Sequence, residues 1–158
     1  MDGNKKQKGR LMSHSKSRTK FFVGVGSILI RDGKVLTVFR NNTEKNNFKH
    51  GLIGGLLQAG ESLKQGAIRE IYEEIGLTVQ PENMRLIHTM SSRENDEEII
   101  GHYFLLEKWE GEPFNKASHK HDRIEWLDLD TLPETLIARN RQAIENMFEE
   151  ISYSEFSS

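Results

Sequence analysis

The sequence predicts a mixed α/β fold in which helices cover a sheet. Apolar, β-branched runs typical of strands occur before residue 60 and again between residues 84 and 129. Between the two groups, apolar residues recur at the spacing of a helix face, and a second amphipathic helix is expected after Pro133. Strands before and after one helix, followed by a terminal helix, indicate a mixed sheet covered by helices.

The first strands are expected to form a hairpin. Residues 21–30 are a continuous apolar run, as in a buried strand, and residues 35–39 are a second one. Asp32-Gly33 lies between them, and this dipeptide between two apolar runs is a strong hairpin signal. The polar residues 41–50 are expected to form a loop, followed by a short, glycine-rich apolar segment at 51–57.

A helix is predicted between Ser62 and Gly76. Ser62 is a favourable N-cap, and Gly76 is a typical terminating residue. Between them, apolar residues recur at four-residue spacing, as on one helix face: Leu63, Ala67, Ile71 and Ile75.

The second half of the chain is predicted to alternate strands and loops. Strands are expected at 84–90, 99–109 and 123–129, with Trp126 as a core residue of the last strand. Polar loops are expected at 91–97 and 111–122. The terminal helix is predicted from its apolar set: Leu136, Ile137, Ala143, Ile144, Met147 and Phe148.

Composition limits the function classes. The chain has 158 residues, 35% hydrophobic and 29% charged, which is typical of one soluble globular domain. It has no cysteine, which excludes disulfides, a thiolate nucleophile and a cysteine zinc site. No apolar run predicts a membrane span or a signal peptide, so we expect a cytoplasmic protein.

The charge is unevenly distributed although the net charge is only −2. Seven of the first twenty residues are Lys or Arg, against one Asp. We predict a disordered basic leader at residues 1–19 and a folded domain at 20–158, and we prefer a solvated tail to a nucleic-acid contact for the leader. The remaining acidic body would repel phosphates unless a bound cation intervened.

Three glutamates share one face of the predicted helix. Glu70, Glu73 and Glu74 stand at i, i+3 and i+4, which places their Cβ atoms roughly 5–6 Å apart. Their charges repel one another, and Arg69 alone cannot neutralise all three. Converging carboxylate oxygens are suitable ligands for a hard cation such as Mg²⁺. The alternative is an ordinary solvated helix face.

A glycine-rich loop precedes this helix. Gly54-Gly55 permits close backbone approach, and Gly60 allows a tight turn before Glu61. Such a loop running into a helix offers backbone groups to a phosphate–metal assembly. A magnesium ion between carboxylates and phosphate oxygens would polarise phosphorus and acidify a bound water.

The segment 55–77 resembles the Nudix box, G-x5-E-x7-R-E-U-x-E-E-x-G-U, where U is a bulky aliphatic residue. All nine specified positions are filled: Gly55, Glu61, Arg69, Glu70, Ile71, Glu73, Glu74, Gly76 and Leu77. Including the flanking strand order, the resemblance spans about residues 20–150 and is greatest to small, single-domain MutT-like members. Ile53 stands where many relatives have proline before the two glycines.

The resemblance implies an α/β/α sandwich with a mixed sheet between helices, and a Nudix hydrolase domain at residues 20–158. It implies hydrolysis of a nucleoside diphosphate linked to X, with Mg²⁺ as cofactor and Mn²⁺ as a substitute. By position, Glu70, Glu73 and Glu74 are metal ligands or the water-activating base, and the Gly55 carbonyl completes the metal shell. Arg69 orients a glutamate, and Glu61 either joins this catalytic group or reaches the metal through a water.

The leading substrate hypothesis is a nucleoside triphosphate or oxidised (d)NTP, in a housecleaning role. A nucleotide sugar, ADP-ribose, a dinucleoside polyphosphate or an RNA cap remains an alternative substrate, because the box handles only the diphosphate. An RNA-binding Nudix protein is a further alternative. Outside the box, Arg40 and Lys49 are candidate phosphate contacts, Glu97 a candidate extra ligand or base, and Asn140 a candidate reader of a base edge. Ordinary surface positions are the competing explanation for each.

Partners follow from the same reasoning. We expect a nucleotide-like small molecule, no membrane, no stable nucleic-acid partner, and a monomer or homodimer. A non-catalytic Nudix sensor should have lost box glutamates, whereas all four are present here. His119-Lys120-His121 is expected to be a polar loop rather than a zinc site, because no further ligands are evident.

Overall fold

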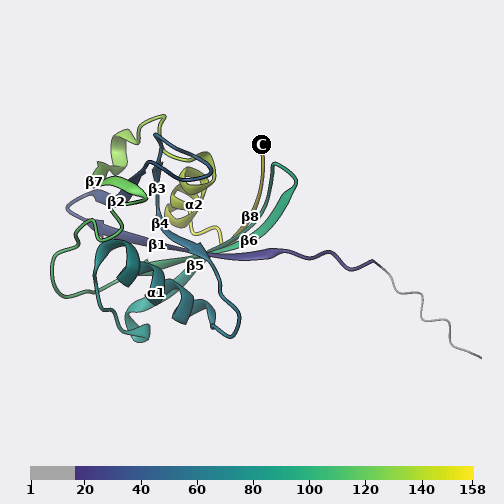
Figure 1. Ribbon diagram of the computed structural model, residues 1–158, viewed down its shortest axis with the longest axis horizontal. Helices are drawn as coiled ribbons and strands as arrows, with labels where there is room; N and C mark the ends of the chain where they lie inside the picture. Colours follow the sequence, from purple (N-terminus) through teal and green to yellow (C-terminus); the bar gives the residue numbers. More distant parts are fainter. Residues whose placement is uncertain (1–16) are drawn as a thin grey trace, which may run out of the picture.

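The computed structural model describes residues 17–158, which form a mixed sheet flanked by two α-helices (Figure 1). In chain order the elements are β1 (Phe22–Arg31), β2 (Lys34–Arg40), β3 (His50–Gly51), β4 (Ile53–Leu56), α1 (Leu63–Ile75), η1 (Pro81–Asn83), β5 (Met84–Glu94), β6 (Glu97–Leu106), β7 (His121–Asp128), η2 (Leu129–Thr131), α2 (Ala138–Phe148) and β8 (Tyr153–Ser157).

Strand β1 is the centre of the sheet. It pairs in parallel with β6, antiparallel with β4, and through a tight turn with β2. β2 in turn pairs with β3 and β7, while β5 lies between β6 and β8. Because β1–β6 and β5–β8 are parallel and the other pairs antiparallel, the predicted mixed sheet is confirmed.

Two apolar cores lie on opposite faces of this sheet. Ala67, Ile71 and Ile75 of α1 pack in one core, and Ala143 and Ile144 of α2 pack in the other. The helices accordingly lie on opposite sides of the strands (Figure 1). The predicted α/β/α sandwich is therefore confirmed.

The predicted hairpin and first helix are also confirmed. Asp32 and Gly33 have φ of 52° and 73°, as a two-residue hairpin turn requires. Ser62 caps α1 through its hydroxyl, which accepts from the Gln65 backbone N–H, and Gly76 ends the helix at φ 71°.

The prediction of a loop at 91–97 was wrong. β5 continues to Glu94, Asn95 and Asp96 form a turn with φ of 49° and 63°, and β6 begins at Glu97. The segment is polar because it borders a cavity and solvent. Polarity alone does not distinguish such a strand from a loop. Asn and Asp tolerate positive φ, so a two-residue turn suffices here.

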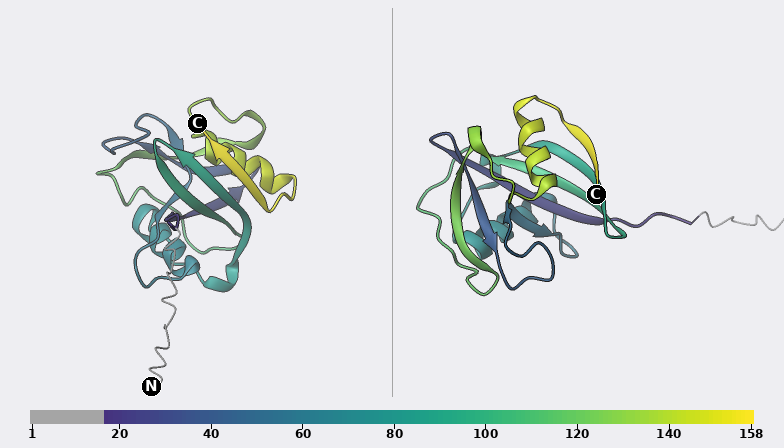
Figure 2. Two further views of the ribbon diagram at one scale, coloured as in Figure 1. Left: turned by 90° about the vertical axis from the view of Figure 1, so that its right-hand side faces the viewer. Right: turned by 90° about the horizontal axis from the view of Figure 1, so that it is seen from above.

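The C-terminal region also differs from the prediction. α2 begins at Ala138, so Leu136 and Ile137 are buried residues of the preceding segment, and Phe148 is 59% exposed. Strand β8 was not predicted at all. It is an edge strand beside β5 (Figure 2), and only two of its five residues are partly buried, so it carries a weak apolar pattern.

An irregularity in β5 changes which of its residues face each core. The ladder with β6 shifts register between Leu86 and His88. One extra residue reverses the alternation of side chains, so Met84 packs in the α1 core whereas Met90 packs in the α2 core. This shift directs Met90, Ser92 and Glu94 to the side on which a large cavity lies.

Residues 1–16, and with them most of the predicted leader, lie outside the described residues, so the leader stays a prediction. Residues 17–21 have no regular secondary structure and lead into β1. Between residues 17 and 158 there is no helix with the length and apolar character needed to cross a membrane.

His50 joins β3 to two other parts of the fold. Its buried imidazole lies 2.6 Å from a Glu125 carboxylate oxygen of β7 and 2.8 Å from the Thr135 hydroxyl. Its backbone N–H donates to the Thr135 carbonyl, and its carbonyl accepts from Ile137 N–H. These bonds hold the segment before α2 against β3, which fixes the start of that helix.

We predict that Glu125→Gln lowers the free energy of unfolding at neutral pH by about 1 kcal/mol. The expected loss is smaller than for a fully buried charged hydrogen bond, because the Glu125 side chain is 38% exposed and solvent screens its charge. The bond from His50 depresses the Glu125 pKa. Its stabilisation is therefore complete above the ordinary carboxyl pKa and is lost as the pH falls through the lower folded value. Urea unfolding should show the wild-type advantage shrinking at acid pH, and an advantage that grew there would contradict this account.

Candidate functional site

The packing of α1 determines which glutamates face inward. Ala67, Ile71 and Ile75 are anchored in the core, so the helix cannot rotate about its axis. Glu70 and Glu74, one turn apart, consequently face β4, whereas Glu73 has a side chain that is 53% exposed. The sequence placed all three on one face, but the structure separates Glu73 from the inward pair.

Glu74 is the most deeply buried of these acids, at 7% exposure. Its Oε2 accepts a hydrogen bond from Gly54 N–H at 2.8 Å, which connects the helix to the loop. Burial, followed by the nearby charge of Glu70, raises the Glu74 pKa to about 8. Two carboxylates are thus held close together in a poorly solvated place.

Glu70 lies against the backbone of Gly55. A Cβ atom on Gly55 would come within 2.4 Å of the Glu70 Oε1, so glycine is required for this contact. The same oxygen accepts from Arg69 Nη1 at 2.8 Å. Gly54 therefore contacts the Glu74 carboxylate and Gly55 contacts the Glu70 carboxylate. The position of both glycines is fixed by their pairing with β1.

Arg69 connects the remaining box residues. Its guanidinium donates to both carboxylate oxygens of Glu61 and also contacts Glu73 and the Leu56 carbonyl. The Arg69 bond, followed by the Gln58 backbone bond, lowers the pKa of Glu61, and Glu61 in turn raises that of Arg69. Arg69 thus pairs with three of the box glutamates, and the orienting role that the resemblance implies stays a prediction.

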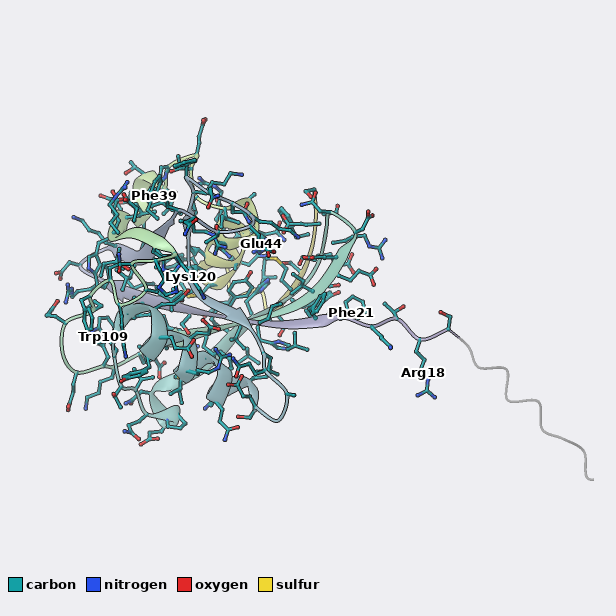
Figure 3. The ribbon with its side chains drawn as sticks, viewed as in Figure 1. Arg18, Phe21, Phe39, Glu44, Trp109 and Lys120 are labelled. Carbon is teal, nitrogen blue, oxygen red and sulfur yellow. The ribbon has the colours of Figure 1, made fainter. Side chains whose placement is uncertain are left out.

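A cavity of about 950 Å³ opens beside Gly54 and Gly55, a size typical of small-molecule sites. Its lining comes from β1, β4, β5, β6, the loop after β2 and the start of α2. Glu44 and Lys120, labelled in Figure 3, are among its lining side chains. Its floor is thus the sheet, and its walls are polar loops.

Basic groups in this cavity differ in their pairing. Arg139 pairs with Glu94, and Lys45 pairs with Glu97 at 2.9 Å. Within residues 17–158, Arg40 and Lys120 form no such pair, and the buried Nε of Arg40 has no hydrogen-bond partner. Burial lowers the pKa of Arg40, which Glu74 partly offsets.

The predicted substrate residues divide accordingly. Arg40, Glu97 and Asn140 line the cavity, although Glu97 is already paired with Lys45. Asn140 is buried, and its side-chain oxygen accepts from Leu52 N–H at 3.1 Å. Lys49 is exposed and does not belong to the lining, and its assignment as a phosphate contact stays a prediction.

His121 was missed as a site residue. It was assigned to a polar loop, yet it starts β7 at 2% exposure, with Nε2 3.6 Å from Glu74 Oε1. Burial, followed by Arg40 and Lys120, lowers the His121 pKa to about 4, so the imidazole is neutral at pH 7. The alternation of His119 and His121 around Lys120 could have indicated the start of a strand. The strand is short and follows a polar stretch, so this pattern is difficult to recognise.

Comparison with known proteins now identifies the family. Residues 20–148 match the NUDIX domain family. The chain belongs to the Nudix family. A MutT NUDIX hydrolase from Burkholderia pseudomallei has the same fold, with a TM-score of 0.74 and 28% identity over 80% of this chain and 98% of that one.

Two relatives bear different activity names. The chain is 32% identical over 113 residues to an ADP-ribose pyrophosphatase of Methanocaldococcus jannaschii, covering 70% of this chain and 64% of that protein. It is 29% identical over 110 residues to an 8-oxo-dGTP diphosphatase of Escherichia coli, covering 70% and 81%. The match thus spans just under two thirds of the archaeal relative.

Nudix hydrolases generally depend on a divalent metal ion, and the donors here fit one. The candidate ligands are all oxygens, as hard cations prefer. Burial, followed by the charge of Glu70, raises the Glu74 pKa, and a cation between the two carboxylates would relieve their repulsion. Within the described residues, no three acidic or histidine side chains are already grouped as a ligand set, so Glu73 would have to turn inward to join the pair.

Gly54→Ala and Gly55→Ala should have different effects. A Cβ on Gly54 would lie 2.1 Å from the Val25 carbonyl oxygen, a backbone atom held in the sheet, so we expect a loss of about 3 kcal/mol in the free energy of unfolding. At Gly55 the obstacle is the movable end of Glu70. That variant should retain most of its stability and lose divalent-metal affinity instead.

Urea unfolding and calorimetric metal titration separate the two results. Equal destabilisation by both substitutions would show that the Gly55 contact serves only packing, contrary to this prediction.

Proposed function

We propose that this chain hydrolyses a phosphoanhydride bond of a nucleoside diphosphate linked to X. Nucleoside triphosphates, oxidised deoxynucleotides among them, are the leading substrates. Mg²⁺ is the proposed cofactor, with Mn²⁺ as a substitute. The observation that carries the proposal is the Glu70–Glu74 pair against Gly54-Gly55, at the edge of a cavity. Two basic side chains of this cavity form no ion pair with any carboxylate of residues 17–158.

The proposed division of labour follows from the contacts. Glu70, Glu73 and Glu74, with the Gly55 carbonyl, would hold the cation. When bound, it would supply positive charge to the phosphoryl oxygens and make a water easier to deprotonate. Arg69 holds Glu70 and Glu61 in place. The water oxygen bonds to phosphorus, a carboxylate of α1 accepts its proton, and the bridging P–O bond breaks with its electrons leaving on the departing phosphate.

Phosphate binding is assigned to the free cations of the cavity. Arg40 and Lys120 have charges that no described carboxylate neutralises through an ion pair, and Arg40 carries a buried N–H group without a partner. A polyphosphate would satisfy both. This surplus of positive charge favours a triphosphate, whereas similarity to the Methanocaldococcus protein favours ADP-ribose.

The domain assignment stays a proposal as well. Residues 20–158 form the proposed hydrolase domain, with the basic residues 1–19 outside it. Free nucleotides as substrates imply a cytoplasmic location and no stable nucleic-acid partner.

A substrate panel tests the function directly. We expect hydrolysis of dGTP, 8-oxo-dGTP or ATP in Mg²⁺, with the nucleoside monophosphate and pyrophosphate as products. Turnover of ADP-ribose alone would transfer the assignment to the alternative substrate. If neither nucleotides, nucleotide sugars nor dinucleoside polyphosphates are cleaved, the proposal is refuted.

Glu74→Gln and Glu70→Gln should each lower kcat at least a hundredfold in Mg²⁺, because each removes a ligand charge, without unfolding α1. Glu107→Gln is the matched control, since that carboxylate pairs with Arg85 on the surface away from the cavity. Near-normal turnover of either box variant, alongside an unaffected control, would contradict the metal-ligand assignment.

Arg40→Gln should raise KM for a triphosphate about tenfold or more, since it removes an unpaired guanidinium from the cavity. Steady-state kinetics at several salt concentrations provide the measurement. The variant should show a weaker salt dependence than the wild type, and an unchanged KM would exclude Arg40 as a phosphate contact.

A further inference from the structure

The segment that leads into β7 is attached to the C-terminal end of α1. The Phe114 N–H donates to the Ile75 carbonyl and the Lys116 N–H to the Glu74 carbonyl, at 3.1 Å each. Both carbonyls belong to the last turn of the helix, where no intrahelical N–H is available to them. The segment therefore has a fixed position beside the Glu74 backbone.

Three further contacts determine where this segment places His121. The His121 N–H donates to the Ala117 carbonyl at 3.0 Å, and the His121 carbonyl accepts from the Asn115 side-chain N–H at 2.9 Å. In the ladder between β2 and β7, His121 stands opposite Arg40. A turn, a side-chain bond and a strand pairing thus hold the backbone of a residue whose imidazole is 2% exposed.

The Glu74 carboxylate meets a different donor group at each oxygen. Oε2 accepts from the Gly54 N–H at 2.8 Å, and Oε1 lies 3.6 Å from the His121 Nε2. The second distance is longer than a hydrogen bond, so a small turn of the carboxylate is needed to close it. The two neighbours lie on β4 and β7, so together they define the orientation of the carboxylate.

Packing alone does not account for an imidazole at this position. Among residues 17–158, the His121 Nδ1 has no hydrogen-bond partner, while Nε2 faces Glu74. Burying a polar ring costs free energy that a leucine of similar size would not cost. A carboxylate that binds a cation is ionised and can only accept, so the imidazole proton belongs on Nε2.

We propose that His121 is a positioning residue that holds the Glu74 carboxylate in the orientation needed to bind a divalent cation. This inference rests on the proposed function. One bond from Gly54 and one from His121 fix the carboxylate plane, and each oxygen keeps a lone pair for the cation. Removing a hydrogen bond that orients a metal ligand typically lowers metal affinity about 10–100-fold.

The test compares His121→Leu and His121→Gln with the wild type. Leucine fills a similar volume without a donor, whereas glutamine keeps a side-chain N–H. Calorimetric titration with Mn²⁺, without nucleotide, should show affinity at least tenfold lower in His121→Leu and less than threefold lower in His121→Gln. Unchanged affinity in His121→Leu, or equal losses in both variants, would overturn the positioning role.

Turnover at different Mg²⁺ concentrations separates positioning from a packing defect. At a concentration that half-saturates the wild type, His121→Leu should be slower by about fivefold or more, as a tenfold weaker metal site implies. At saturating Mg²⁺ its kcat should recover to within threefold of the wild type, with KM for the nucleotide within twofold. A kcat that stays low at every Mg²⁺ concentration would contradict the proposal.

His119→Leu is the matched control, because it makes the same substitution at an exposed residue outside the cavity lining. It should leave the Mn²⁺ affinity unchanged. If His121→Leu fails to fold, nitrogen NMR of the imidazoles in the wild type reads the His121 tautomer with Mg²⁺ bound. The expected result is a proton on Nε2, and a proton on Nδ1 alone would refute the proposed bond to Glu74.

The two proposals fail in different ways. A wild-type chain that binds Mn²⁺ but cleaves no nucleotide refutes the hydrolase assignment, and the Mn²⁺ affinities still decide the role of His121. An active wild type whose folded His121→Leu variant binds Mn²⁺ equally well overturns the positioning role and leaves the hydrolase assignment in place.

Discussion

The contact between the buried carboxylate of Glu74 and the backbone N–H of Gly54 determines the geometry of the whole site. It joins a helix on one face of the sheet to a strand within it, and both sides are independently fixed. The apolar stripe of α1 sets the rotation of the helix, and pairing with β1 sets the position of Gly54. An acid in so little solvent is costly unless hydrogen bonds or a cation compensate.

Charge separation allows an acidic protein body to accept an anionic substrate. The box acids are concentrated on one turn of α1, where Arg69 partly compensates them. Arg40 of β2 and Lys120, from the segment before β7, line the same cavity as Gly54 and Gly55. Negative and positive groups thus meet at the glycines, and a metal–phosphate pair would be complementary to both.

Strand irregularities and short strands position the cavity. The shift in β5 turns Met90, Ser92 and Glu94 toward it, and the Asn95-Asp96 turn ends the ladder at its border. On the far side, His50 holds the segment leading into α2, so that Arg139 and Asn140 reach the lining. The polar side of the cavity is therefore built by segments whose sequences show little apolar periodicity.

The hairpin at Asp32-Gly33, the capped helix and the box glutamates could be read from the sequence, because each depends on residues close together in the chain. The mixed sheet followed from the order of strands and helices along the chain. The folded chain was needed to show that Glu73 is exposed, that His121 is buried beside Glu74, that Lys49 lies outside the cavity, and that β8 completes the sheet. Those outcomes depend on contacts between segments far apart in the chain. Local periodicity carries no information about which distant strand supplies a neighbour, or about the single extra residue in β5 that reverses its faces.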